Sequence, residues 1–139
     1  MKMDDEKCIT KKQAIEVAKR FIESQLCDEA WYQNINEHLS AIVLYGSVAK
    51  GVNRADSDID ILFFLPLEIE EKYTTGEYFY KFEGKEINIV IRSIEKLRQI
   101  AEEKNDEFQK EIFRGAEIIW SRDDEVAKLL RDIALINQS

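Results

Sequence analysis

The chain contains few of the residues that build disulfide frameworks or zinc sites. Its 139 residues include two cysteines, one proline and one histidine. Cys8 and Cys27 are too few for a disulfide framework and do not form a CxxC pair. With His38 as its single histidine, the chain cannot build a His-rich zinc site or a pair of catalytic histidines, and we expect His38 to be an ordinary polar residue. A cytoplasmic protein with reduced thiols is therefore expected.

Long apolar runs are also missing, and the charge is unbalanced. The opening MKMDDEKCITKK lacks the apolar segment of a signal peptide, and no run approaches the roughly 20 apolar residues of a membrane span. Acidic residues outnumber basic ones, 28 to 20, which gives a formal charge of −8. This argues against broad nucleic-acid binding, which needs Lys and Arg against phosphates. A nucleotide held through a metal ion stays compatible, because the cation supplies positive charge.

The length predicts one domain, residues 1–139, with a single sizeable core. Apolar spacing predicts helices over 10–26, 28–39, 94–103, 106–115 and 123–136, strands over 40–45 and 58–66, a hairpin over 77–93 and an edge strand over 116–120. This order indicates an α+β fold with a mixed α/β sheet and helices mainly on one face. We assign 1–39 to N-terminal helices, 40–120 to the sheet core and 121–139 to a C-terminal helix.

The stretch YGSVAKGVNRADSDIDILFFL (45–65) places a Gly-Ser pair after one predicted strand and three aspartates at the start of the next. Gly46 and Gly51 are separated by four residues, as in a P-loop. A P-loop then needs Lys and Ser/Thr, but Val52 and Asn53 follow here. The spacing therefore excludes a P-loop.

The aspartates also begin like a calcium-binding EF-hand loop, which requires Gly at its sixth position and Glu at its twelfth. Counted from Asp56, those positions are Ile61 and Leu67, so this interpretation fails too. Asp58 and Asp60 are the remaining pair, because residues two apart on a strand point to the same face. Two carboxylates so close repel each other unless a cation lies between them.

Magnesium suits such a pair, since it binds one or two carboxylates together with substrate phosphates. Two such ions can activate an attacking oxygen and stabilise a leaving one. Gly46 and Ser47 follow a strand directly, where exposed N–H groups and a hydroxyl can bind phosphate oxygens. Phosphoryl or nucleotidyl transfer needs little beyond such positioning and charge neutralisation.

Gly46-Ser47, ten residues, then Asp58-Ile59-Asp60 resembles the GSx₁₀DxD signature of the polymerase β-like nucleotidyltransferase superfamily. The AKG at 49–51 and Ser57 before the first aspartate are similar to its minimal nucleotidyltransferase branch. The strong part of the match covers about residues 40–65, with the polymerase β-like fold as its implication.

The resemblance implies that Asp58 and Asp60 are catalytic and bind Mg²⁺, as a two-ion site, with Mn²⁺ as the alternative ion. It implies an NTP, ATP by preference, whose phosphates meet Gly46 and Ser47; Lys50 and Ser57 are further phosphate-binding candidates. The implied reaction transfers a nucleoside monophosphate to an acceptor hydroxyl and releases pyrophosphate. A HEPN-type helical protein is the implied partner, a homodimer is left open, and no membrane association is expected.

One position departs from the family pattern. A later strand usually carries a third carboxylate, as metal ligand or general base, and EINIV places Asn88 there. Asn cannot accept a proton and is a weaker magnesium ligand; Glu86, two residues earlier on the same face, is the substitute. Two alternatives stay open: an antitoxin-like binding module with a weakened site, and an antibiotic-modifying nucleotidyltransferase. The aromatic residues Trp31, Tyr78, Phe79 and Trp120 are expected in the core or in an interface, not as a platform for a base.

Overall fold

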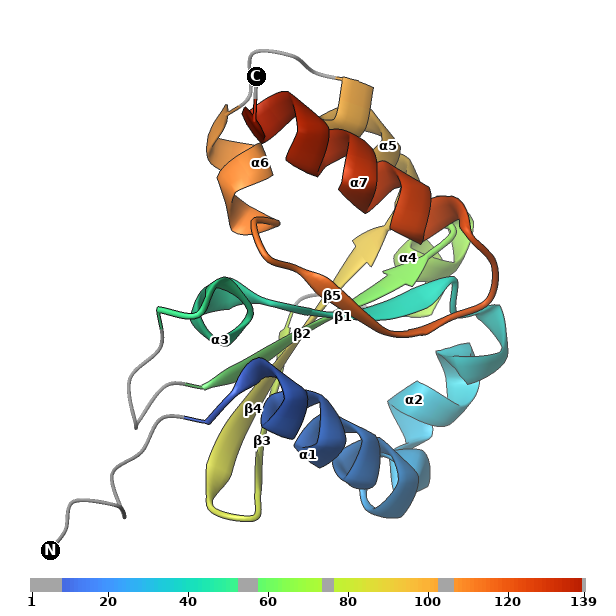
Figure 1. The fold of residues 1–139 in the computed structure, drawn as a ribbon. Helices are drawn as coiled ribbons and strands as arrows, with labels where there is room; N and C mark the ends of the chain where they lie inside the picture. The colour runs from blue at the N-terminus through green and yellow to red at the C-terminus, as the bar shows by residue number, and fades with distance from the viewer. Residues whose placement is uncertain (1–8, 53–57, 74–76, 103–106, 139) are drawn as a thin grey trace, which may run out of the picture.

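The computed structural model describes residues 9–52, 58–73, 77–102 and 107–138. Within these ranges the chain forms a five-stranded sheet in the order β3-β4-β2-β1-β5 (Figure 1). The strands are β1 Ala41–Tyr45, β2 Ile59–Leu65, β3 Glu77–Phe82, β4 Lys85–Ser93 and β5 Glu117–Ser121. Each coincides with a run that the sequence predicts to be extended, and β5 lies at an edge as expected.

The sheet is mixed, which confirms the predicted α+β class. β2 and β4 pair in parallel, and β1–β2, β1–β5 and β3–β4 pair antiparallel. A parallel pair needs a crossover connection, and here the crossover contains α4 (Leu67–Tyr73) and β3. As a result β2 and β4, which are distant in the sequence, lie side by side in the centre of the sheet.

Helices cover both faces of the sheet, which corrects the expectation of helices mainly on one face (Figure 1). On one face, α1 (Lys11–Ser24) and α2 (Ala30–Ile35) pack on the isoleucines and alternate apolar residues of β1, β2 and β4. On the other, α5 (Ile94–Glu102), α6 (Glu107–Ile112) and α7 (Glu125–Gln138) pack on Val43, Leu62, Phe64 and Val90. Strands buried on both sides read as continuous apolar runs, so the sequence signalled two covered faces.

Two helical details differ from the sequence prediction. The expected helix over 28–39 is divided into 3₁₀ turns at Leu26–Asp28 and Asn36–His38 with α2 between them. The short helices α3 (Gly46–Lys50) and α4 were not predicted; α4 begins after Pro66, whose carbonyl accepts the backbone N–H groups of Ile69 and Glu70. None of the helices in the described ranges combines the length and the apolar character needed to cross a membrane.

Aromatic contacts fix the β3–β4 hairpin to α2. The ring of Trp31 stacks on Tyr78, with centroids 3.9 Å apart and planes 8° from parallel. Trp31 Nε1 donates a hydrogen bond of 2.7 Å to the Tyr80 hydroxyl, which in turn donates one of 2.7 Å to Glu29. These contacts hold Tyr78 and Tyr80 on the face covered by α1 and α2. The residue between them must therefore point to the other face.

Candidate functional site

Four side chains from four strands form one row across the sheet. Strand register places Tyr45 beside Asp60, Asp60 beside Asn88, and Asn88 beside Phe79. Directly paired residues point to the same face, so the four line up; we call them the site row. The row lies on the face of α5, α6 and α7, at the end of β1 and the start of β2. As predicted, Asp58 and Asp60 alternate with Ile59, which is buried in the opposite core.

The amide of Asn88 lies between the two carboxylates. Its Nδ2 donates a hydrogen bond of 2.8 Å to Asp58 and one of 3.2 Å to Asp60. The positive end of an amide dipole thus sits where two like charges would otherwise face each other. Because the register pairs Asn88 directly with Asp60, Asn88 occupies the position at which the family resemblance places a third carboxylate.

The surroundings of Asp60 disfavour its negative charge. Burial raises the pKa of this carboxyl, the negative charge of Asp58 raises it further, and the hydrogen bond from Asn88 lowers it in part. Burial and the charge of Asp60 also raise the pKa of Tyr45 to about 12. Tyr45 is therefore a neutral phenol. It lies beside two carboxylates that repel each other, and a cation bound between the aspartates would offset that repulsion.

The donor set fits magnesium. Asp58 and Asp60 offer hard carboxylate oxygens, and the Asn88 amide can offer its oxygen by rotating about its last bond. In the described part of the chain no group of three or more His, Cys, Asp or Glu residues is arranged to hold a metal ion. Two carboxylates with substrate phosphates and water are a usual magnesium environment.

Gly46 fits closely against Asp60. It follows β1 with a φ of +83°, and a Cβ atom there would overlap Oδ2 of Asp60. The sequence predicted phosphate binding at Gly46. The structure shows that the absence of a side chain there also leaves room for the Asp60 carboxylate. Ser47 follows as the second residue of α3, and α3 ends at Gly51, whose φ is +77°.

The remaining predicted site residues lie outside the site row. Lys50 is only 19% exposed and forms a 3.3 Å ion pair with Glu111 of α6. Glu86 is exposed opposite Lys81 and lies one residue before the partner of Ile59, level with Asp58. Ser57 lies outside the described residues. Metal binding by Asp58 and Asp60, phosphate binding by Gly46, Ser47, Lys50 and Ser57, and roles for Glu86 and Asn88 all stay predictions.

Two members of the site row were not predicted as site residues from the sequence. Tyr45 immediately precedes the Gly-Ser pair and belongs to the stretch that resembles the family signature, but no role followed for it. Phe79 was expected in the core or in an interface; the residue is 67% exposed and so does not lie in the core, while an interface role stays a prediction. Beside Tyr45, a pocket of about 350 Å³ extends under α5 and α6 over Leu62 and Val90.

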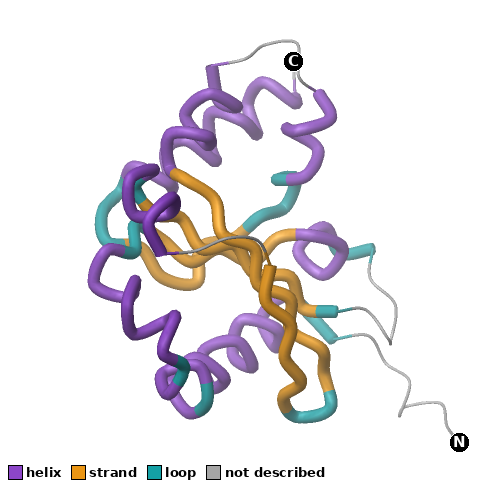
Figure 2. Tube along the Cα trace, turned by 180° about the vertical axis from the view of Figure 1, so that it is seen from behind, coloured by secondary structure: helices purple, strands orange, loops and turns teal. Residues whose placement is uncertain are grey.

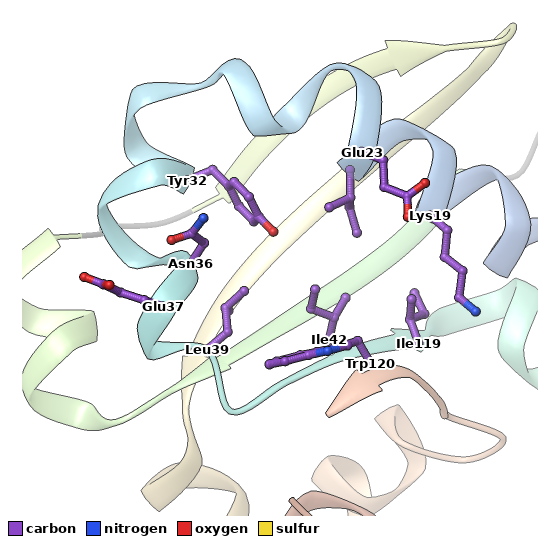
Figure 3. A pocket seen from close by; sticks show the side chains of 10 residues that line it. Lys19, Glu23, Tyr32, Asn36, Glu37, Leu39, Ile42, Ile119 and Trp120 are labelled. Atoms are coloured by element: carbon purple, nitrogen blue, oxygen red, sulfur yellow. The ribbon is translucent and has the colours of Figure 1, made fainter. Parts of the chain in front are cut away.

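A larger pocket, of about 540 Å³, lies on the opposite face (Figure 3). Tyr32 and Asn36 border it from the helical side, and Ile42 and Trp120 from the sheet. Ile42 belongs to the core under α1 and α2. The sheet therefore separates this pocket from Asp60, whose side chain lies on the other face.

Comparisons with known proteins bear on the family and the fold of the chain. The family model for Polymerase beta, Nucleotidyltransferase matches residues 31–125, more than half of the chain. A nucleotidyltransferase-like protein from Exiguobacterium sibiricum has a similar fold, with a TM-score of 0.55 at 7% identity. The similarity covers 86% of this chain and 38% of that one. No curated protein sequence matches the chain.

The matched family model places this mixed-sheet fold in the nucleotidyltransferase class. The chain belongs to the polymerase β nucleotidyltransferase family.

Replacing Gly46 by alanine is expected to displace the Asp60 carboxylate. Gly51→Ala is the matched control, since both glycines have positive φ but a Cβ at Gly51 meets nothing within 4 Å. We expect each variant to lose about 1 kcal/mol of folding free energy from left-handed strain. Only Gly46→Ala should shift the Asn88 side-chain amide signals in an NMR spectrum, because those protons bond to the two carboxylates. Equal shifts in both variants would contradict this role of Gly46.

Neutralising Asp60 is expected to stabilise the metal-free protein. Because the folded state raises the pKa of Asp60, its charge opposes folding once the pH is above that raised value. Asp60→Asn should therefore have a higher free energy of unfolding than wild type at pH 7. The difference should shrink as the pH falls through the raised pKa and vanish below the ordinary value of 3.8.

Urea titrations at several pH values without divalent cations measure this difference. Asp132→Asn, at an exposed position on α7, is the control for the removal of one aspartate. An Asp60→Asn variant less stable than wild type at pH 7 would refute the argument.

Proposed function

We propose that the protein is a magnesium-dependent nucleotidyltransferase that moves a nucleoside monophosphate, AMP from ATP by preference, to an acceptor hydroxyl. The single observation that carries the proposal is the convergence of Asp58 and Asp60 beside Gly46 and Ser47, in a chain of the polymerase β family. In the reaction, the acceptor oxygen bonds to the α-phosphorus and the bond to the bridging oxygen of pyrophosphate breaks.

Each residue has a definite task in this proposal. Asp58 and Asp60 hold Mg²⁺, which would supply charge neutralisation for the phosphates. Ser47 and the backbone at Gly46 lie beside Asp60, on the β1 side, and bind the β- and γ-phosphates. Tyr45, a neutral phenol, can donate a hydrogen bond without adding negative charge to the site. Asn88 orients both carboxylates but cannot accept the acceptor's proton, which passes to water or to Glu86.

The acceptor is proposed to be a HEPN-type helical protein. The charge of −8 opposes broad nucleic-acid binding and does not oppose a protein acceptor. An antibiotic-like small molecule is the alternative, and the 350 Å³ pocket beside Tyr45 is large enough for one. The similarity covers 38% of the structural neighbour's length, so that comparison does not identify the acceptor.

A second candidate function is an antitoxin-like binding module with a weakened nucleotide site. Asn88 favours it, because the amide replaces a carboxylate at the centre of the donor set. Loss of a general base slows transfer by about 10²–10⁴-fold and does not by itself prevent nucleotide binding. Binding and turnover must therefore be measured separately.

Removing both carboxylate charges is expected to abolish Mg²⁺-dependent nucleotide binding while the fold is retained. The test compares wild type with the Asp58→Asn/Asp60→Asn double variant. Calorimetry measures ATP binding with and without Mg²⁺, and ATP labelled at its α-phosphate reports transfer into a lysate of the native host. Label transferred by wild type alone would support the enzyme; unchanged affinity in the double variant would refute the proposed site.

Restoring the third carboxylate separates the two candidate functions. If Asn88 marks a slowed enzyme, Asn88→Asp should raise the transfer rate by about 10²-fold or more, because a carboxylate can accept the proton. Glu86→Gln is the companion variant, and a loss of activity there would assign the proton to Glu86. No transfer by wild type or Asn88→Asp, despite Mg²⁺-dependent ATP binding, would favour the binding module.

A further inference from the structure

Phe79 is an exposed aromatic residue in line with the proposed catalytic aspartates. Its side chain is 67% exposed, although it lies between two tyrosines that pack inward. Strand register places it directly beside Asn88, which is directly beside Asp60. Two inter-strand spacings separate Phe79 from Asp60, about 10 Å. That span is comparable with the separation between the α-phosphate and the base of a nucleotide.

The orientation of Phe79 is fixed by the contacts of its two neighbours on the opposite face of the sheet. Tyr78 and Tyr80 are anchored to α2 through Trp31, so Phe79 cannot turn inward without breaking the stacked pair and its hydrogen bond. At the tip of the hairpin, Arg20 of α1 donates two hydrogen bonds to Glu83, of 3.0 and 2.7 Å. Figure 2 shows the hairpin reaching beyond the rest of the sheet, with its turn at the far end. The hairpin that carries the Phe79 ring is therefore fixed by contacts with α1 and α2.

The direction of the nucleotide follows from the two sides of the aspartate pair. Gly46 and Ser47 lie on the β1 side of Asp60, where the proposed function places the departing pyrophosphate. The nucleoside must then extend the opposite way, across β4 toward β3. On that side Phe79 is the side chain that continues the site row.

We propose that Phe79 is the stacking surface for the nucleobase of the NTP, an inference that rests on the proposed function. Stacking on an aromatic ring accepts every base, because each base has a flat π-face. Purines, which cover more of the ring, are the preferred class. The face of β3 beside Phe79 carries Glu77 and Lys81, which gives the exocyclic groups of a base polar neighbours.

Comparing a nucleotide with a ligand that lacks the base tests this directly. Calorimetry measures binding of α,β-methylene-ATP and of tripolyphosphate, each with Mg²⁺, to the full chain. The variants are Phe79→Ala, Phe79→Trp and, as a matched control, Trp120→Ala. Trp120 is also an exposed aromatic residue, 43% accessible, but it lies on the opposite edge strand.

Phe79→Ala should weaken binding of the ATP analogue about 5- to 30-fold and leave tripolyphosphate binding unchanged. Phe79→Trp should retain affinity for the analogue, and Trp120→Ala should change neither ligand. Unchanged affinity for the analogue in Phe79→Ala would overturn the inference. The pocket under α5 and α6 would then be the alternative place for the nucleobase. Equal weakening of both ligands would overturn it too, since the effect would not involve the base.

Failure of the proposed function has a different signature. If wild type binds neither ligand in a Mg²⁺-dependent way, the phosphate and metal site itself is refuted, and the assignment of Phe79 falls with it. Gel filtration of wild type and Phe79→Ala completes the test. A dimer lost in Phe79→Ala, with nucleotide affinity unchanged, would make the ring a contact between copies and overturn the inference.

Discussion

The arrangement of the whole site depends on two carboxylates sharing one amide. Asn88 donates to Asp58 at 2.8 Å and to Asp60 at 3.2 Å, and burial already opposes the charge of Asp60. This contact requires β2 and β4 to be parallel neighbours in a single register, since a shift by one residue would turn Asn88 to the opposite face. It also requires a residue without a side chain at Gly46, where β1 ends against Asp60.

The sheet face that carries the site is shared with a hydrophobic core. Along β2, Leu62 and Phe64 pack under α5 and α7, while Asp60, on the same face, does not belong to that core. The hydrophobic core under α5 and α7 and the candidate aspartate site therefore share one face of β2. The other face, under α1 and α2, is apolar along the strands, and its packing supports the strands that carry the candidate site.

Much of the site was accessible from the sequence, because strand periodicity is local. Alternation placed Asp58 and Asp60 together and Ile59 in the core, and the Gly-Ser pair marked the end of β1. Periodicity alone did not give the partner of β2; the family resemblance pointed to Asn88, and the register of β2 and β4 shows it directly beside Asp60. For Phe79, three aromatic residues in succession give no preferred face, and a long-range contact, Trp31 on Tyr78, decides it. The second layer of helices was missed although the unbroken apolar run of β2 is typical of a strand buried on both faces.

The parallel pairing of β2 and β4 is also a condition for the contact between Asn88 and the two aspartates. Asn88 lies 30 residues from Asp58 and 28 from Asp60 in sequence, so both hydrogen bonds close long loops. Forming these contacts costs the entropy of closing those loops. Both hydrogen bonds depend on the crossover through α4 and β3, which brings β4 beside β2. A chain in which β4 is absent or out of register would carry the residues of the signature without the contact between Asn88 and the two aspartates, so that contact reports that the sheet is complete.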